Sequence, residues 1–592
     1  MKKILLFSVL LCVTFTLWGR PAHNGAIRYT QPDGSVIEIY RHGDEWGRWT
    51  TNAAGKVISL DADGFYREME GVTPKMAAQA AAIRRKAFRQ QENAAYASSA
   101  PVAVGQKHFL VILVQFSDVS FKAENDREAF YNLMNQPGYS VDGHSGSARD
   151  YYYDNSHGYF EPIFDVYGPV TLSNTQAYYG ANTMSGDDAH PGEAVAEGCK
   201  LLDGQIDFSQ YDNDGDGEVD LVFMFYAGYG EADSPYENTI WPHRYWLQYS
   251  GDSVTLDGKK INSYSCSNEL NYYGSLAHKL CSIGTPTHEF AHAMGLPDFY
   301  DIDYDDNEAC TALTYFSVMD TGCDCNDGRT PPYFNIVERI LLGWLDDDVI
   351  KPFVKDGPVT LPSVQNNIAY ITTTDMDGEY FIYECRSNEG WDKALGAYGL
   401  LVYHYDRSSR IVEGGYSASA LWNYWAINVY GNHPCFYVVP SADQSNVRYG
   451  MTYYPGYGYY FTGDLSGFPF PGSKNVTSYT AKSWNGVDSE ISLSDISYAS
   501  NVVTFTVSGA AADIGYNTIA NPGKGSYSAG SKFDFQLVEV ATRPVQSVKW
   551  YFDGALQSAG SVTLTAGSHI VEAVLSLEDG TVDTVTLEIK AQ

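Results

Sequence analysis

The sequence HEFAH at residues 288–292 places two imidazoles and one carboxylate at a spacing that suits a metal ion. Because a helix advances about 3.6 residues per turn, His288 and His292 are expected one above the other on the same helical face. Two imidazoles in this arrangement can share one zinc ion, and Glu289, one step round the helix, then points toward a water on that ion. The pattern therefore predicts a zinc site with Glu289 as its general acid and base.

The flanking residues are expected to shape this helix and to supply a third ligand. Thr285 is the expected N-cap, and Pro286 then takes the first helical position, where its missing N–H costs nothing. Gly295 can end the helix in a left-handed conformation and turn the chain back. Asp298 would then reach the metal. We predict that Asp298 and the two histidines hold the zinc ion.

This donor set predicts the activation of a water molecule. A catalytic zinc ion takes nitrogen and carboxylate ligands at roughly 2.0–2.2 Å and keeps one position open. A water in that position loses its proton near pH 7 instead of about 15.7, and the metal polarises a carbonyl group. Glu289 would take the proton and pass it to a leaving amine, a step worth roughly 10²–10⁴-fold. With one aspartate, the site is less positive than three histidines would make it, so the water should be somewhat less acidic.

A second pattern follows downstream, in the sequence YFSVMDTG at 315–322. Metzincin-type zinc peptidases have a methionine turn after the zinc motif. A methionine on its own is most often a core residue that fills a gap. Because Met319 follows a complete zinc motif, we predict that it forms this turn beneath the metal.

Several stretches resemble the M6 family of secreted metallopeptidases, the immune inhibitor A group. The resemblance covers most of the chain from about 20 to 410, and it implies a metzincin-like zinc peptidase that cleaves proteins. Asp298 stands where the commoner metzincin pattern has histidine. The resemblance supports aspartate there, with Asp301 or a more distant glutamate as alternatives. It is carried by HEFAHAMGLPDFYD at 288–301, FSVMDTG, PPYFNIVERILLGWL, HFLVILVQFSDVSF at 108–121, SARDYYYDNSHGYF at 147–160 and GAYGLLVYHYDRS at 396–408.

The composition limits the partners of the chain. It has 592 residues, 38 Lys and Arg against 72 Asp and Glu, and a net charge of −34 at pH 7. A chain this acidic repels nucleic acid and anionic membranes, so we exclude both as partners. Its length exceeds what one hydrophobic core can organise, so several domains are expected.

The first residues predict export. Lys2 and Lys3 precede the apolar stretch 4–17, and small and polar residues follow near Gly19. This arrangement is typical of a signal peptide, which we place at 1–19. No later segment is long and apolar enough to span a bilayer. We expect an exported protein that is secreted, held at the cell surface or kept in the periplasm. Eight cysteines follow the signal, an even number that permits disulfides of undefined pairing.

The remaining chain is expected to be a multidomain α+β protein. Strand patterns at 25–70 and an alanine-rich helical stretch at 76–99 with a basic cluster predict a propeptide at 20–100. A permanent N-terminal domain is the alternative. Because this segment has no cysteine, His42, Asp44 and Glu45 are the candidates for capping the metal. The domains expected next are a metzincin-like zinc peptidase domain at 101–345, a β-rich domain at 346–510 and an Ig-like β-sandwich at 511–592, with Trp550 in its core.

Within the peptidase domain, apolar runs predict buried strands, and periodic apolar patterns predict the helices around them. The expected strands lie at 108–116 and 219–227, and the expected helices at 125–135, 191–202, 286–295 and 333–343.

The sequence YDNDGDGEVD at 211–220 resembles the start of a calcium-binding loop of the EF-hand type. The side chains of Asp212, Asp214, Asp216 and Asp220 and the carbonyl oxygen of Glu218 could surround one ion. The twelfth position is phenylalanine in place of the usual glutamate, so a complete EF-hand is not expected. So many carboxylates in one loop repel each other without a cation, which favours structural calcium over an ordinary acidic turn.

These patterns lead to two hypotheses. The first is a secreted zinc-dependent endopeptidase that acts on extracellular proteins and is made as a zymogen. The alternative is an extracellular adhesin or binding protein on a zinc-bearing scaffold, whose C-terminal β domains would contact matrix or glycan. The intact Glu289 favours the first, since a structural zinc site does not require it.

Overall fold

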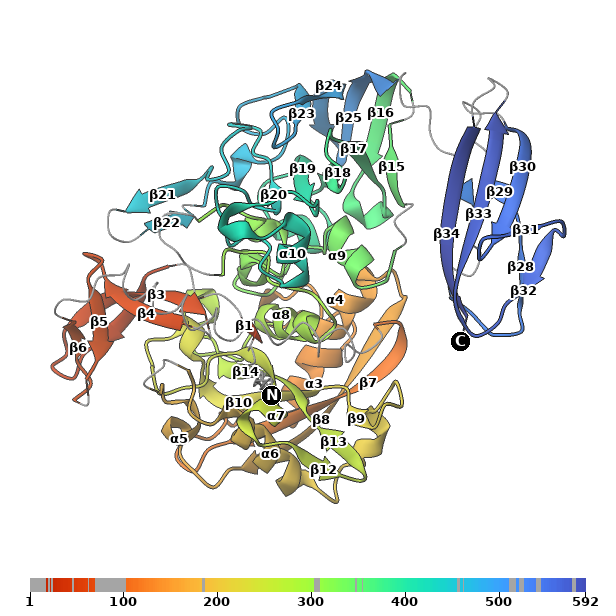
Figure 1. Ribbon diagram of the computed structural model, residues 1–592. Helices are drawn as coiled ribbons and strands as arrows, with labels where there is room; N and C mark the ends of the chain where they lie inside the picture. The colour runs from red at the N-terminus through yellow and green to blue at the C-terminus, as the bar shows by residue number, and fades with distance from the viewer. Residues whose placement is uncertain are drawn as a thin grey trace, which may run out of the picture. The chain divides into compact units, whose positions relative to one another are not determined.

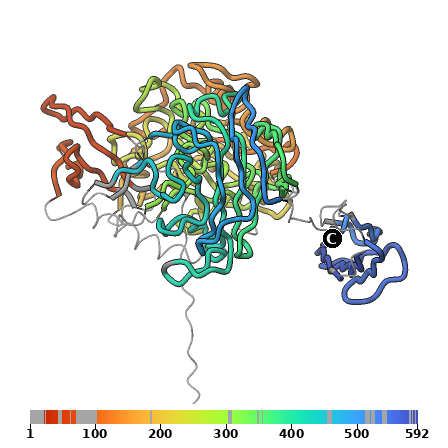
Figure 2. Tube along the Cα trace, turned by 90° about the horizontal axis from the view of Figure 1, so that it is seen from above, coloured from red at the N-terminus to blue at the C-terminus, as the bar shows by residue number. Residues whose placement is uncertain are grey.

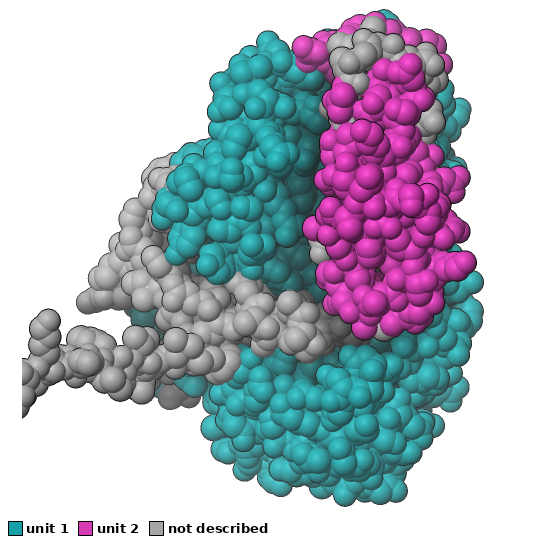
Figure 3. Space-filling view, turned by 45° about the vertical axis from the view of Figure 1, so that its right-hand side comes forward, with its two compact units in different colours: residues 1–351, 359–489, 494–505 teal, residues 352–358, 490–493, 506–592 magenta. Residues whose placement is uncertain are grey.

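The computed structural model describes most of the chain and is rich in β-structure. Its residues divide into two compact units, teal and magenta in Figure 3. Unit 1 lies within 1–351, 359–489 and 494–505, and unit 2 within 352–358, 490–493 and 506–592. The border predicted near residue 345 falls inside unit 1. The described residues are 18–19, 22, 25–44, 47–61, 63–69, 103–183, 187–302, 309–345, 349–353, 355–454, 458–461, 463–510, 518–520, 526–538, 545–577 and 582–591.

A mixed sheet organises the segment 101–345, for which a peptidase domain was predicted, within unit 1. Its strand order is β1-β11-β14-β10-β7-β8, and the strands from β14 to β8 run parallel. β11 pairs antiparallel with β14, and β1 pairs antiparallel with β11 at the edge. The bounds are β1 (Trp18–Gly19), β7 (Gly105–Gln115), β8 (Phe160–Thr171), β10 (Val222–Tyr229), β11 (His243–Trp246) and β14 (Ser263–Leu270).

Helices cover both faces of this sheet (Figure 1), which explains why β7 and β10 are continuous apolar runs. On one face, Phe109 and Val111 of β7 pack with residues of α3, α4 and α8. On the other face, Leu110 and Ile112 pack with residues of α6. The bounds are α3 (Arg127–Asn135), α4 (Ala148–Asn155), α6 (Pro191–Leu202) and α8 (Gly284–Ala293).

The predicted elements of this region are confirmed with small shifts of their ends. The helix expected at 191–202 has these bounds, with a proline at its start. The helix expected at 333–343 is shorter: α9 spans Ile336–Leu341, and the side chain of its N-cap Asn335 accepts a hydrogen bond from the N–H of Glu338. A capping box thus sets the beginning of α9.

The residues from 27 to 68 form the predicted small β-rich unit, an antiparallel sheet drawn in red in Figures 1 and 2. Arg41 in this sheet is buried and contacts the segment 231–237, outside the small sheet. The helix predicted at 76–99 lies outside the described residues. The bounds are β2 (Ile27–Thr30), β3 (Val36–Asp44), β4 (Gly47–Asn52), β5 (Val57–Leu60) and β6 (Tyr66–Glu68).

The strands that follow residue 345 share the hydrophobic core of the segment before them. One core cluster joins Phe290 of α8 and Met319 to Ile382 of β18 and Leu401 of β19. These strands belong to the sheet β15-β17-β18-β19-β20. The bounds are β15 (Ile350–Pro352), β17 (Ala369–Thr373), β18 (Glu379–Arg386), β19 (Gly399–Asp406) and β20 (Phe436–Val438).

The other elements before residue 510 are short helices, small sheets and the sheet β16-β25-β24-β23. They are α5 (Gln176–Gly180), α7 (Leu247–Ser250), α10 (Ala418–Asn423), β9 (Glu218–Val219), β12 (Val254–Leu256), β13 (Lys259–Ile261), β16 (Gly357–Pro362), β21 (Met451–Tyr454), β22 (Gly458–Phe461), β23 (Tyr479–Lys482), β24 (Asp488–Ala499) and β25 (Val502–Ser508). Among the described helices, none combines the length and the apolar character needed to cross a bilayer.

The C-terminal strands form the sheet β27-β34-β33-β30-β31 and two small pairs, β26-β29 and β28-β32. Their core contains Phe533, Val571 and Leu575. Trp550 packs against this core and stacks on Phe535 with 5.4 Å between ring centroids. The bounds are β26 (Thr518–Ile519), β27 (Ser526–Tyr527), β28 (Lys532–Asp534), β29 (Leu537–Val538), β30 (Val545–Phe552), β31 (Ala555–Gln557), β32 (Ser561–Thr563), β33 (Gly567–Leu577) and β34 (Val582–Ala591).

Candidate metal centre

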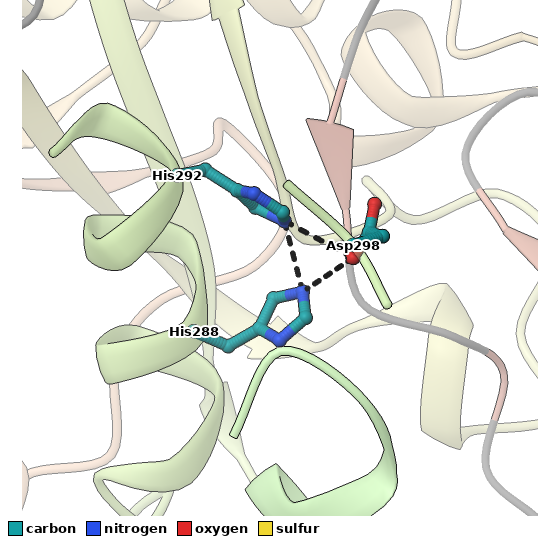
Figure 4. Close-up of side chains that lie close together, drawn as sticks. All are labelled: His288, His292 and Asp298. Atoms are coloured by element: carbon teal, nitrogen blue, oxygen red, sulfur yellow. Dashed lines mark hydrogen bonds and ion pairs between the residues drawn. The ribbon is translucent and has the colours of Figure 1, made fainter. Parts of the chain in front are cut away.

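Helix α8 and the loop after it bring three donor side chains together, as Figure 4 shows. Nε2 of His288 lies 3.0 Å from Nε2 of His292, and each of these atoms lies 3.4 Å from Oδ1 of Asp298. All three side chains are buried. Tetrahedral zinc with bonds of about 2.0–2.1 Å places its ligand atoms about 3.3–3.4 Å apart. The three donors therefore fit a zinc ion.

Backbone carbonyls fix the tautomer of both histidines. Nδ1 of His288 lies 2.7 Å from the carbonyl oxygen of Val318, and Nδ1 of His292 lies 2.8 Å from that of Leu296. Since a carbonyl only accepts, each Nδ1 must carry a proton and donate it. In the neutral rings both Nε2 atoms then present lone pairs, facing each other and the carboxylate. Such a cluster of acceptors calls for a cation between them.

The protonation states of the cluster suit metal binding. Burial would raise the pKa of Asp298, but His292 and His288 outweigh it and hold the pKa at about 2. Burial lowers the pKa of His292 below its ordinary value, although Asp298 acts in the opposite direction. At neutral pH the aspartate is ionised and His292 is neutral, as ligation requires.

The start of α8 differs from the prediction. The helix begins at Gly284 with Ile283 as N-cap, so Thr285 is not the N-cap and Pro286 lies inside the first turn. Glycine is required at 284 because this end of the helix packs closely against backbone of the segment around Cys323. At the other end, Gly295 has φ 110°, so the expected positive φ after the helix is confirmed.

The short turn at 317–319 supports two of the three donors. It lies between the 3-10 helices η5 (Thr314–Phe316) and η6 (Thr321–Asp324). Its Val318 carbonyl holds His288, and its Met319 carbonyl accepts a 2.9 Å hydrogen bond from the N–H of Phe299, next to Asp298. A shift of this turn would therefore move ligands from both ends of the site.

The remaining predicted residues of the site are also buried. Glu289 is fully buried on α8, and its backbone carbonyl accepts a 3.0 Å hydrogen bond from Ser265 of β14. Met319 is fully buried in the core that contains α8. Among the described residues, the carboxylate that meets both imidazoles is that of Asp298, and Asp301 is not part of the cluster.

The acidic loop brings together three of its five predicted ligands. Carboxylate oxygens of Asp212, Asp214 and Asp216 lie within 4.8 Å of one another. The Asp212 carboxylate also pairs with Lys259 at 2.5 Å. Asp220 instead accepts hydrogen bonds from Asn213, and burial raises its pKa to about 6. The Glu218 carboxylate pairs with Lys260 at 2.7 Å.

The residues predicted to cap the metal from the N-terminal segment have other surroundings or are not described. Nε2 of His42 lies 2.8 Å from Thr51 Oγ1, in the neighbouring strand, and the ring stacks on Trp49. Burial lowers the pKa of His42 to about 3. Glu45 lies outside the described residues, as does the side chain of Asp44.

Several groups of this centre had no signal in the sequence. The carbonyls of Val318 and Leu296 act through backbone atoms, so no residue type marks them. The phenolic group of Tyr152, which donates a 2.6 Å hydrogen bond to the carbonyl of Thr287, stands in a run of three tyrosines. The sequence alone does not indicate which of these tyrosines faces α8.

Two histidines one helical turn apart, an aspartate from the following loop and a glutamate beside the first histidine define the class of this domain, that of a metallopeptidase. Comparison with known families supports this class. Residues 102–333 match the family described as Immune inhibitor A peptidase M6, catalytic domain. This segment therefore belongs to the M6 family of metallopeptidases.

Curated relatives share the same region. The pre-pro-metalloprotease PrtV of Vibrio cholerae serotype O1 (strain M66-2) is 26% identical over 261 residues, which cover 37% of this chain and 28% of that protein. Immune inhibitor A of Bacillus thuringiensis subsp. alesti is 25% identical over 265 residues, which cover 38% of each protein. The chain thus spans less than half the length of the curated relatives it matches.

Among solved structures, the fibronectin(III)-like modules of Clostridium thermocellum CbhA align with 13% of this chain and 94% of their own length. The sequence identity is 22% and the TM-score is 0.11.

Proposed function

We propose that this protein is an exported, zinc-dependent endopeptidase that is made as a zymogen and hydrolyses peptide bonds in extracellular proteins. His288, His292 and Asp298 would hold the zinc ion, Glu289 would act as general acid and base, and Met319 would form the turn beneath the site. The domain would then be metzincin-like.

One observation carries the proposal. Two Nε2 lone pairs and an ionised carboxylate oxygen converge within 3.0–3.4 Å in a buried space. Both imidazole protons are committed to carbonyl oxygens, so no proton is available between these three acceptors. A divalent cation removes this repulsion, and a donor set of two imidazoles and one carboxylate suits zinc.

When bound, zinc would supply a Lewis acid for the scissile carbonyl and an acidic water. The chain's own residues would do the rest. Glu289 would hold the proton of the attacking water on its carboxylate and later give it to the leaving amine. The Val318 and Leu296 carbonyls would keep the two imidazoles oriented and increase their basicity.

The edge of the central sheet supports binding of an extended peptide. β11 pairs antiparallel with the two residues of β1, Trp18 with Arg244 and Gly19 with His243. Without β1, the backbone groups of β11 would be open to another extended segment, and β11 contacts α8. Strand addition at such an edge is a common way to bind peptides without a strict sequence requirement.

Contacts of the N-terminal sheet support the zymogen. Nε of Arg41 donates to the Ser234 carbonyl at 3.0 Å, and Nη1 donates to Glu237 at 3.2 Å. The hydroxyl of Tyr66 donates to the Pro235 carbonyl at 2.7 Å. These contacts hold the segment that leads into β11. A propeptide at 20–100 could therefore restrain the peptide-binding edge until it is cleaved, and the Vibrio relative is itself named a pre-pro-metalloprotease.

The other parts of the chain would serve the peptidase. Asp212, Asp214 and Asp216 would hold a structural calcium ion that rigidifies their loop. The segment 511–592 would be an Ig-like sandwich that contacts matrix or glycan. The signal at 1–19 would direct the protein to the medium, the cell surface or the periplasm.

The direct test is casein cleavage by the full chain after limited proteolysis within the alanine-rich stretch at 76–99, which carries the basic cluster. The Glu289→Gln variant should keep its zinc and lose at least the general-base factor of roughly 10²–10⁴. His292→Ala should lose both zinc and activity. Glu128→Gln, at an exposed position of α3, is the matched control and should behave like the wild type.

Full activity in Glu289→Gln would overturn the assigned mechanism. If the wild type were folded and bound zinc but cleaved neither casein nor denatured proteins, the adhesin hypothesis would replace the peptidase.

A further inference from the structure

A buried arginine outside the family-matched segment contacts the backbone just before the turn that supports the metal centre. Arg386 stands at the end of β18, and its side chain is fully buried. The matched family segment ends at residue 333. The Nη2 atom of Arg386 donates a 3.1 Å hydrogen bond to the carbonyl of Phe316, the residue before the 317–319 turn.

All five N–H donors of this guanidinium have acceptors. Nε donates to Glu384, Nη1 donates to the Tyr333 carbonyl and to Asp392, and Nη2 donates to the Phe316 carbonyl and to the Tyr403 hydroxyl. The five distances are 2.7, 2.7, 3.0, 3.1 and 3.3 Å in this order. A planar fork with every donor used fixes its neighbours in direction as well as in distance.

The carboxylates around Arg386 keep it charged. Burial alone would lower the pKa of Arg386, but Asp392 and Glu384 hold it well above the ordinary value. Both carboxylates are themselves fully buried. The second oxygen of Glu384 accepts from the N–H of Ile336 at 2.7 Å and so holds the start of α9.

The 317–319 turn is also held from α9. The hydroxyl of Ser317 donates to Glu338, and its oxygen accepts a 3.0 Å hydrogen bond from the N–H of Met319. Glu338 in turn accepts from the N–H of Asn335 at 2.6 Å. The network around Arg386 therefore ends on the turn whose carbonyls hold His288 and the loop of Asp298.

We propose that Arg386 is a positioning residue of the metal centre: its guanidinium holds the 317–319 turn in place, and the turn in turn orients His288 and Asp298. This rests on the proposed function, because it assumes that these residues bind zinc. The strand β18 is then a part of the metal site, although it belongs to a segment after the peptidase motif.

Lysine cannot replace this group. It keeps the charge but offers three donors from one nitrogen in place of a planar fork. Arg386→Lys would leave the turn without the bond to Phe316 or leave a carboxylate uncompensated. Changes in groups that orient metal ligands typically lower metal affinity by about 10–100-fold. We expect a loss of this size.

The test measures metal binding by the full-length protein with zinc and cobalt(II) as probes. Chelator competition gives the zinc Kd, and the visible absorption of the cobalt form reports the ligand geometry. Arg386→Lys should raise the zinc Kd by about 10–100-fold, change the cobalt spectrum, and lower kcat of the activated enzyme more than it raises KM.

Arg339→Lys is the matched control. Arg339 is also fully buried nearby, but its Nη1 donates to the Val364 carbonyl and to Asn367, not to the turn. This variant should lose stability while its zinc Kd and cobalt spectrum stay at wild-type values. A folded Arg386→Lys protein with wild-type Kd and spectrum would overturn the proposal.

If Arg386→Lys does not fold, the same measurements on Tyr403→Phe test the proposal. This change removes one acceptor of Arg386 Nη2 and leaves the charge of Arg386 in place. A higher zinc Kd than in Arg339→Lys supports the proposal, and wild-type values overturn it. The two proposals fail differently. A wild-type protein that binds neither zinc nor cobalt at His288, His292 and Asp298 refutes the metal centre itself.

Discussion

A Cβ atom at Gly284 would lie 1.9 Å from the carbonyl oxygen of Cys323. The first residue of α8 thus packs against backbone just past the 317–319 turn, at a distance that only glycine permits. Because residue 284 has no side chain, the helix that carries both histidines can approach the backbone of η6, the segment that follows the turn.

Gly284→Ala should destabilise the protein strongly. The clash involves backbone on both sides and cannot be relieved by rotating a side chain, so we expect about 3 kcal/mol, the upper end of typical overpacking costs. Urea unfolding gives the free energy, and zinc content reports the site. Gly560→Ala is the control, since a Cβ there meets no atom within 4 Å. Equal stability of the two variants would contradict the packing argument.

The metal-free protein should lose stability as the pH falls below about 6.5. Burial lowers the pKa of His292 in the folded state, while unfolding returns it to the ordinary value. Between these two pKa values the unfolded chain binds more protons, so stability rises with pH and its contribution is complete above the unfolded pKa. Thermal midpoints of chelator-treated protein measure this slope. His292→Asn should have a smaller slope over the same range, and an unchanged slope would assign it to other groups.

Arg41→Met should loosen the N-terminal sheet. The change leaves Glu231, which is fully buried 3.7 Å from the guanidinium, without this cation. Removal of one partner of a buried ion pair typically costs about 3–5 kcal/mol. We expect faster proteolysis within residues 27–68 and earlier appearance of casein cleavage. Arg28→Met, at an exposed position of the same sheet, should change neither.

Calcium should stabilise the acidic loop. At a concentration hundredfold above its Kd, a ligand that binds only the folded state adds about 2.7 kcal/mol. The thermal midpoint of the wild type should therefore rise with added calcium, and Asp214→Asn should reduce the rise. Asp207→Asn is the control, because Asp207 lies close by in sequence but outside the cluster. An identical response of all three proteins would refute a calcium site here.

A chain that ends at residue 510 should still cleave casein after activation. The metal centre and the core around it lie in unit 1, whereas the strands after 510 form a core of their own. Thermal unfolding would verify that the shortened protein is folded. Loss of cleavage by a folded, zinc-bound truncation would favour the binding-protein hypothesis.

The sequence revealed those parts of the fold whose chemistry is local. β7 was predictable because a short continuous apolar run is typical of a buried strand. α6 was predictable because an amphipathic pattern that begins with proline is typical of a helix. The placement of His288 and His292 on one helical face was predictable because their spacing is a property of one helix. Asp298 followed from a single glycine turn.

The missed parts depend on distant contacts. β14 has all eight residues of SYSCSNEL buried in the centre of the sheet, yet its small and polar side chains form no apolar run. Glu384 and Arg386 stand two residues apart on β18, so they lie on the same face, as charged residues do on a solvent-exposed face of a strand. Their full burial and the contact of Arg386 with the Phe316 carbonyl distinguish a buried network from an exposed one, and no local pattern encodes these distant contacts.

The core shared by α8, β18 and β19 limits how this chain can be recombined with other sequences. Asn428, far beyond the zinc motif, donates a 2.6 Å hydrogen bond to the carbonyl of Phe299, beside the third donor. A chimera could join the first 345 residues to the following strands of a distant relative. It would carry every residue of the motif but would lack the residues that pack against α8 and the loop of Asp298. The strands after residue 510 have a core of their own and could be exchanged as a module, whereas β18 and β19 share their core with α8 and could not.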